Sequence, residues 1–111
     1  MAKLPPAYKH FQQTFRSVWE AYDRLGAAVH QEGPIKPKFR ELVKLGIAIG
    51  GRLEGAVKAH TRLALEQGAA PEEIRHVALM AVTTVGFPTA MAALTWIEDV
   101  LPKRRGARKK R

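Results

Sequence analysis

Residues 37–62 read PKFRELVKLGIAIGGRLEGAVKAHTR, and this stretch decides the fold. Pro37 can open a helix, because its fixed φ angle suits the first helical turn. The helix predicted over residues 37–51 has apolar residues around most of its circumference, which is typical of a buried helix. The helix predicted over residues 53–67 is two-faced, with an apolar stripe made of Leu53, Ala56, Val57, Leu63 and Ala64. The short turn between them predicts an antiparallel helix pair.

The rest of the body continues the helical pattern in both directions. Gly68 is a C-cap for the 53–67 helix, and Pro71 opens a fourth helix whose buried stripe runs from Ile74 to Val85. The turn Gly86-Phe87-Pro88 leads into a fifth helix over residues 88–101, with its inward positions at Met91, Leu94 and Ile97. No segment shows strand alternation between turn signals. The sequence therefore predicts an all-α fold of about five helices.

The predicted first helix, residues 6–30, has a seam of large apolar residues. They alternate at spacings of three and four, which places them on one side of a helix: Tyr8, Phe11, Phe15, Val18, Tyr22, Leu25 and Val29. The simplest interpretation is an amphipathic helix facing a core. The aromatic content of the seam also predicts that it covers other helices or a neighbouring subunit, and hence that the chain forms oligomers.

Composition restricts the class of protein. The chain has 111 residues and no cysteine, which excludes disulfides and thiolate metal sites and fits a reducing compartment. The first ten residues, MAKLPPAYKH, lack the apolar region of a signal peptide. Every apolar run is shorter than the ~20 residues that a membrane span needs. These features predict a soluble, cytoplasmic protein that does not enter membranes.

The net charge of +9 comes mainly from the C-terminal tail. Residues 103–111 read KRRGARKKR, with seven positive charges, and subtracting them leaves +2 for the rest. We therefore predict one domain over residues 1–102 and a basic tail over 103–111. A block of like charges is usually a solvated terminus. The alternative is weak, salt-sensitive binding of nucleic acid or another polyanion.

Glu41 and His60, nineteen residues apart, are the best candidates for chemistry. Glu41 shares a helix face with Leu45 and Ala48, which predicts that it is partly buried. Because the two residues lie on consecutive helices joined by a short turn, we expect them to be neighbours in a partly enclosed pocket. Histidine is the natural general acid or base near neutral pH, and a carboxylate partner can fix its tautomer. Each residue also has a structural explanation. His60 could be a core histidine bonded to the backbone, and Glu41 could pair with neighbouring lysine or arginine residues on the helix surface.

The spacing of these two residues resembles the carboxymuconolactone decarboxylase family, which includes the AhpD-like alkylhydroperoxidases. In that AhpD-like branch, a Glu is followed after twelve residues by Cys-x-x-Cys and, four residues later, by His. Here Leu53 and Ala56 occupy the two cysteine positions. Thiol peroxidase chemistry needs a thiolate, so the substitution excludes that activity. The resemblance covers roughly residues 36–100 and implies an AhpD-like helical fold assembled as a homotrimer or homohexamer.

Two further residues are candidates for substrate binding through the same resemblance. His60-Thr61-Arg62 matches a His-x-Arg sequence of the true decarboxylases, and arginine suits a carboxylate substrate. Arg62 lies about 200° around the helix from His60, so an interface role or a salt bridge with Glu66 is an alternative. Gly86-Phe87-Pro88 resembles the turn of the decarboxylase branch, which commonly has tyrosine at the position of Thr84.

The resemblance implies two alternative functions. The first is a cofactor-free lyase that acts on a small carboxylate or lactone and uses Glu41 and His60 as an acid/base pair. The second is a non-catalytic oligomeric scaffold or binding protein that keeps the fold. No cofactor is expected, and the four histidines lack the acidic or cysteine neighbours at ligand spacing that a metal site needs.

Overall fold

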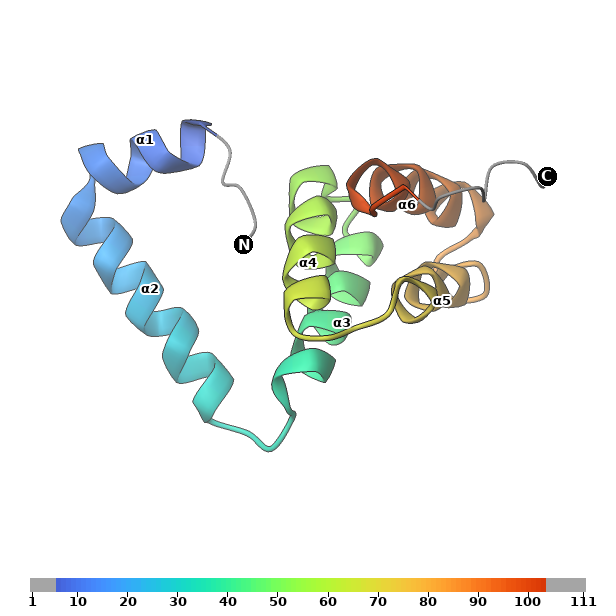
Figure 1. Ribbon diagram of the computed structural model, residues 1–111, viewed down its shortest axis with the longest axis horizontal. Helices are drawn as coiled ribbons and strands as arrows, with labels where there is room; N and C mark the ends of the chain where they lie inside the picture. The colour runs from blue at the N-terminus through green and yellow to red at the C-terminus, as the bar shows by residue number, and fades with distance from the viewer. Residues whose placement is uncertain (1–5, 104–111) are drawn as a thin grey trace. The chain divides into compact units, whose positions relative to one another are not determined.

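The computed structural model describes residues 6–103 and contains helices but no strand within that range (Figure 1). The predicted all-α fold is therefore confirmed. The chain divides into two compact units, Met1–Lys36 and Pro37–Arg111. The prediction of one domain over residues 1–102 stays a prediction. Most of the predicted basic tail, residues 104–111, lies outside the described residues.

The described part of the first unit, residues 6–36, contains two helices where the sequence predicts one. α1 spans Pro6–Thr14 and α2 spans Arg16–Gln31. Between them, Phe15 leaves helical geometry with φ −119° and ψ 57°. Aromatic rings pack across this break, with the Tyr8 and Trp19 centroids 5.3 Å apart in an edge-to-face arrangement. Neither glycine nor proline marks the break, so the local signals that usually end a helix do not predict it.

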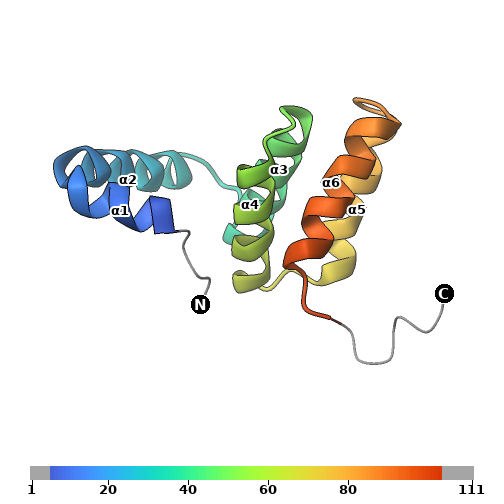
Figure 2. The ribbon, with the colours of Figure 1, turned by 90° about the horizontal axis from the view of Figure 1, so that it is seen from above.

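The described part of the second unit consists of four helices in two pairs: α3 (Pro37–Gly50) beside α4 (Glu54–Glu66), and α5 (Pro71–Ala81) beside α6 (Phe87–Val100). Figure 2 shows the two pairs lying side by side. Proline opens α3 and α5, as predicted. Gly68 follows α4 with φ +94°, and Gly86 precedes α6 with φ +109°. Both glycines therefore supply backbone conformations that L side chains rarely adopt.

The core of the second unit is built largely from alanine. Large buried residues, such as Leu45, Ile49, Ile74 and Ile97, alternate with buried alanines at positions 48, 64, 78, 81, 90 and 93. Small side chains allow helix axes to approach closely, which suits a unit of four short helices. The sequence predicts Leu53, Leu63, Val85 and Met91 as inward, but these side chains are exposed. Thr61, Ala90 and Ala93 take core positions instead.

A three-residue turn joins α3 to α4 and fixes how the two helices meet. The Arg52 N–H donates to Ile49 O at 2.9 Å, and the Leu53 N–H donates to Ala48 O at 3.0 Å. This pattern closes the end of α3 as a Schellman motif. Arg52 occupies the left-handed position with φ 53°, where glycine is usual. Its guanidinium donates to Thr89 Oγ1 at 2.8 Å, which ties the turn to the start of α6.

Candidate functional site: the Glu41–His60 pair

Glu41 is a carboxylate held almost completely inside the second unit. It lies one helical turn before Leu45 on α3, on the face that packs against the core, and 7% of its surface is exposed. A buried carboxylate requires hydrogen-bond partners, because burial removes its hydration. The partial burial expected from its neighbours Leu45 and Ala48 is therefore confirmed.

His60 provides a partner from the neighbouring helix. Its Nδ1 lies 2.8 Å from Glu41 Oε1, within hydrogen-bond distance. The bond joins α3 to α4 across nineteen residues of chain, so the predicted spatial neighbourhood of the two residues is confirmed. The His60 side chain is 23% exposed. His60 therefore lies at the edge of the core, with one side of the ring on Glu41 and another toward solvent.

The hydrogen bond assigns different roles to the two ring nitrogens. A carboxylate can only accept, so Nδ1 carries a proton and donates it to Glu41. Within residues 6–103, no hydrogen bond involves His60 Nε2, and no buried side-chain nitrogen or oxygen lacks a partner. Nε2 therefore reaches the surface of the chain. An oriented imidazole with one accessible nitrogen can pass a proton to or from a bound molecule.

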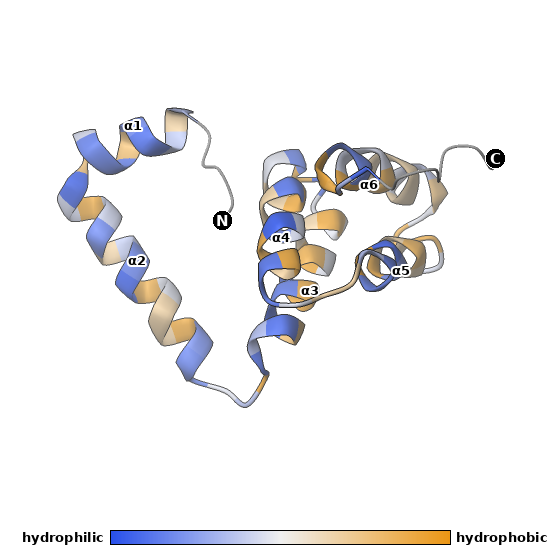
Figure 3. Cartoon of the chain, viewed as in Figure 1, coloured by the Kyte–Doolittle hydropathy of each residue, from blue (hydrophilic) through white to orange (hydrophobic). Residues whose placement is uncertain are grey.

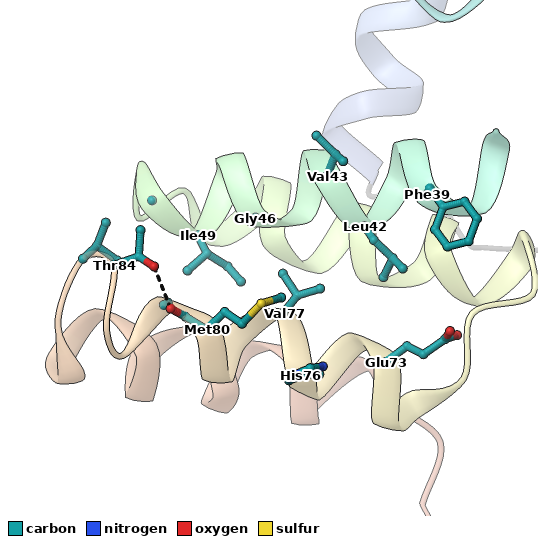
Figure 4. Close-up of a pocket in the computed structure, with 13 residues that line it drawn as sticks. Phe39, Leu42, Val43, Gly46, Ile49, Glu73, His76, Val77, Met80 and Thr84 are labelled. Carbon is teal, nitrogen blue, oxygen red and sulfur yellow. Dashed lines mark hydrogen bonds between the residues drawn. The ribbon is translucent and has the colours of Figure 1, made fainter. Parts of the chain in front are cut away.

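A cavity of about 560 Å³ lies between α3 and α5 (Figure 4). Its lining is mainly apolar, with Phe39, Leu42, Val43 and Ile49 from α3, Val77 and Met80 from α5, and Val85 after α5. We call it the α3–α5 cavity. Neither Glu41 nor His60 lines it. An enclosed pocket around the pair is what the sequence leads us to expect, and the α3–α5 cavity is not that pocket.

An ion pair joins α3 to α5 at Glu73, one of the residues that line the α3–α5 cavity. Lys38 Nζ lies 3.0 Å from Glu73 Oε2 and so connects the first turns of α3 and α5. Glu73 Oε1 also accepts from the Ala70 N–H at 2.8 Å, which caps α5. The Ala70 N–H, and then the Lys38 ammonium, lower the pKa of the Glu73 carboxyl below its usual value. Sequence reasoning missed this contact, because Lys38 and Glu73 are 35 residues apart.

The two predicted substrate-binding residues lie apart from the Glu41–His60 pair. Thr84 lines the α3–α5 cavity together with His76 and Met80, and its Oγ1 donates to Met80 O at 2.8 Å. Arg62 is half-buried on α4, one turn after Lys58, which contacts Asp99 of α6. Arg62 therefore faces a different side of α4 from His60, at about 200° around the helix axis.

The described part of the chain was also searched for metal sites and for membrane-spanning helices. Residues 6–103 contain no group of three or more His, Cys, Asp or Glu side chains that could hold a metal ion. In the same range, no helix combines the length and the apolar character that crossing a membrane requires.

Comparison with known proteins assigns the family. The profile of the carboxymuconolactone decarboxylase family matches residues 17–99 of this chain. The chain belongs to the carboxymuconolactone decarboxylase family. The predicted resemblance is therefore confirmed, for a family member without cysteine. A search of curated proteins finds no match.

A solved structure of the same family has a similar fold. It is the crystal structure of apo-lpg0406, a carboxymuconolactone decarboxylase family protein from Legionella pneumophila. The two chains share 23% sequence identity, with a TM-score of 0.71 over 85% of this chain and 87% of the other. At this identity the similarity establishes the helical fold of the carboxymuconolactone decarboxylase family, and the site is argued from this chain's own residues.

The two positions where the AhpD-like branch has cysteine lie at the start of α4. Leu53 is the N-cap residue and is exposed, and Ala56 is partly buried. His60 follows Ala56 by one helical turn, so Ala56 lies next to His60 on the same side of α4. In this family member, apolar side chains take the place of the thiols beside an intact Glu–His hydrogen bond.

Proposed function

We propose that this chain is a cofactor-free lyase of the carboxymuconolactone decarboxylase type, with His60 as the proton-transfer residue and Glu41 as the residue that orients it. The observation that carries the proposal is the 2.8 Å hydrogen bond between His60 Nδ1 and the buried carboxylate of Glu41. It holds the ring in one orientation and leaves Nε2 accessible. Family membership supports the reaction type.

The proposed reaction is the loss of carbon dioxide from a small carboxylate or lactone. The carbon–carbon bond to the carboxylate breaks, and its electron pair stays on the substrate as an enolate. The imidazolium form of His60 then transfers its Nε2 proton to that carbon, which forms the new carbon–hydrogen bond. Throughout, Nδ1–H stays bonded to Glu41, whose negative charge stabilises the imidazolium before transfer. The neutral ring regains a proton from water.

Substrate binding is the part of the proposal that rests on Arg62, because Thr84 lines the α3–α5 cavity, which neither Glu41 nor His60 lines. A guanidinium can hold a carboxylate through two parallel hydrogen bonds. Because Arg62 faces away from His60 on the same helix, a substrate on His60 would meet Arg62 only from another copy of the chain. The proposal therefore includes a homotrimer or homohexamer, in which a pocket between copies would complete the site.

A second candidate function is a non-catalytic oligomeric scaffold that retains the fold of the family. It is favoured by the position of the α3–α5 cavity, which does not reach Glu41 or His60. In that case the Glu41–His60 hydrogen bond would serve only to join α3 to α4.

Release of carbon dioxide distinguishes the two functions. Purified protein would be incubated with a panel of small lactone carboxylates, beginning with a carboxymuconolactone, and evolved carbon dioxide would be measured. We expect His60→Gln to lower the rate at least about 100-fold, since general acid–base catalysis contributes about 10²–10⁴-fold. Glu41→Gln should lower it less, because the amide oxygen can still accept from Nδ1.

His10→Gln is the matched control, because His10 is an exposed histidine on α1 that bonds Thr14 and does not line the α3–α5 cavity. It should leave the rate within about twofold of the wild-type value. Absence of carbon dioxide from the whole panel would favour the scaffold. Equal rates for His60→Gln and the wild type would remove His60 from the mechanism.

A further inference from the structure

The first unit presents an apolar face that its own helices do not cover. Neither α1 nor α2 has a buried residue. We define the α2 seam as Val18, Tyr22, Leu25 and Val29, whose exposed fractions lie between 57% and 63%. Figure 3 shows hydrophobic positions recurring along α2 between hydrophilic ones. The charged residues Glu20, Asp23 and Arg24 lie more than about 100° around the helix from the seam.

The second unit presents an apolar groove that a helix could fill. The sides of the α3–α5 cavity include Phe39, Val43, Met80 and Val85, with exposed fractions between 46% and 51%. Its interior side chains, such as Ile49 and Val77, lie between α3 and α5 in Figure 4. The two helices run in the same direction, since Lys38 contacts Glu73 at their starts and Gly46 lies opposite Val77. Two helices side by side offer a long groove to a third.

The two faces match in length and in spacing. The cavity extends along α3 from Phe39 to Gly50, and the seam extends along α2 from Val18 to Val29. Each distance covers eleven residues, or about 16 Å at the helical rise of ~1.5 Å per residue. The seam residues lie at positions i, i+4, i+7 and i+11, which is the pattern of an amphipathic helix lying in a groove.

We propose that the α2 seam of one copy docks into the α3–α5 cavity of a second copy, and that each copy gives one seam and receives another. The area supports this exchange. A large apolar side chain has a surface of roughly 150–200 Å², and about half of that surface is exposed here. Four such side chains on the seam and four on the cavity would together bury about 600–800 Å² in each contact. A stable interface buries about 1,200–2,000 Å² in total, so two reciprocal contacts between the same two copies reach that range and one contact does not.

The absence of cysteine from the chain makes the contact directly testable, because every introduced thiol is then unique. Leu25→Cys protein and Met80→Cys protein, one enlarged by a tag, would be mixed and treated with a short thiol–thiol crosslinker. The expected product is the mixed dimer. The matched control replaces Leu25→Cys with Ala27→Cys, on the opposite side of α2, and should give little of that product.

Three results would overturn the proposal. The first is a Leu25→Cys protein that crosslinks to itself in higher yield than to Met80→Cys, because α2 would then pair with α2. The second is a Leu25→Cys/Met80→Cys double variant that crosslinks only within one chain. The third is a wild-type mass equal to the monomer mass of 12.3 kDa in light scattering at tens of micromolar.

A substitution in the cavity gives an independent measurement. Met80→Glu places a charge in the α3–α5 cavity at an exposed position, so the helices should still form, as circular dichroism would check. We expect the dissociation constant of the oligomer to rise at least about tenfold. Thr83→Glu, exposed but outside the cavity lining, is the control and should leave it unchanged. An equal effect of both variants would contradict the docking geometry.

Discussion

Replacing His60 by alanine should destabilise the second unit through its effect on Glu41. The change removes the donor that lies 2.8 Å from Glu41 Oε1, and that carboxylate is only 7% exposed. A hydrogen bond to a charged group contributes about 1.5–3 kcal/mol to stability. Because the His60 side chain is 23% exposed, water can enter and replace part of the lost bond. We therefore expect a loss of about 1–2 kcal/mol.

Urea denaturation followed by circular dichroism would measure this loss, with a corresponding fall in Tm of about 4–15 °C. A double-mutant cycle with Glu41→Leu, which removes the acceptor oxygen, separates the pairwise contribution from the loss of packing. A coupling energy above about 0.5 kcal/mol is expected for residues in contact. If the two single effects add to within about 0.3 kcal/mol, the bond does not contribute to stability and our reasoning about the pair is refuted.

Three further predictions concern pH, glycine and peroxide. Contacts with Ala70 and Lys38 lower the pKa of Glu73, so its stabilisation is present above the unfolded value of 4.5 and disappears as pH falls through the folded pKa. The difference in urea midpoint between wild type and Glu73→Gln should therefore be larger at pH 7 than at pH 3. Gly55→Ala has open space for its Cβ and should raise the free energy of unfolding by about 0.5 kcal/mol. Gly68→Ala, at φ +94°, should lower it by about 1 kcal/mol in the same urea assay. Effects of the same sign in the two variants would contradict this prediction. The protein should not reduce organic hydroperoxides with a dithiol above a heat-killed control, since it has no thiolate, and measurable turnover would disprove the exclusion.

The helix boundaries of the second unit could be predicted because local chemistry sets them. Pro37 and Pro71 begin helices, and Gly68 and Gly86 adopt positive φ beside helix ends, as their residue types indicate. The break at Phe15 could not be predicted. It carries no glycine or proline signal, and the ring contact across it between Tyr8 and Trp19 cannot be read from periodicity.

The candidate site was predictable where it depends on sequence spacing alone. Glu41 and His60 lie on consecutive helices with a short connection, so their separation along the chain constrains their distance in space. The α3–α5 cavity depends on how α3 packs on α5, and the intervening α4 hides that relation from the sequence. The prediction of which residues face inward was wrong at several positions for a related reason. The apolar pattern predicted that large residues such as Met91 are buried. In the structure the small residues Ala90 and Ala93 are buried instead, because the helices pack closely there.

The Schellman turn between α3 and α4 makes residues 51–53 a fixed spacer between acid and base. Surface turns are usually where a protein accepts inserted residues. Here the N–H groups of Arg52 and Leu53 already donate to carbonyls of α3, so an added residue would break these hydrogen bonds. One extra residue would rotate α4 by about 100° relative to α3 and carry His60 away from Glu41. Lengthening this turn would therefore separate the pair while leaving both residues in the sequence.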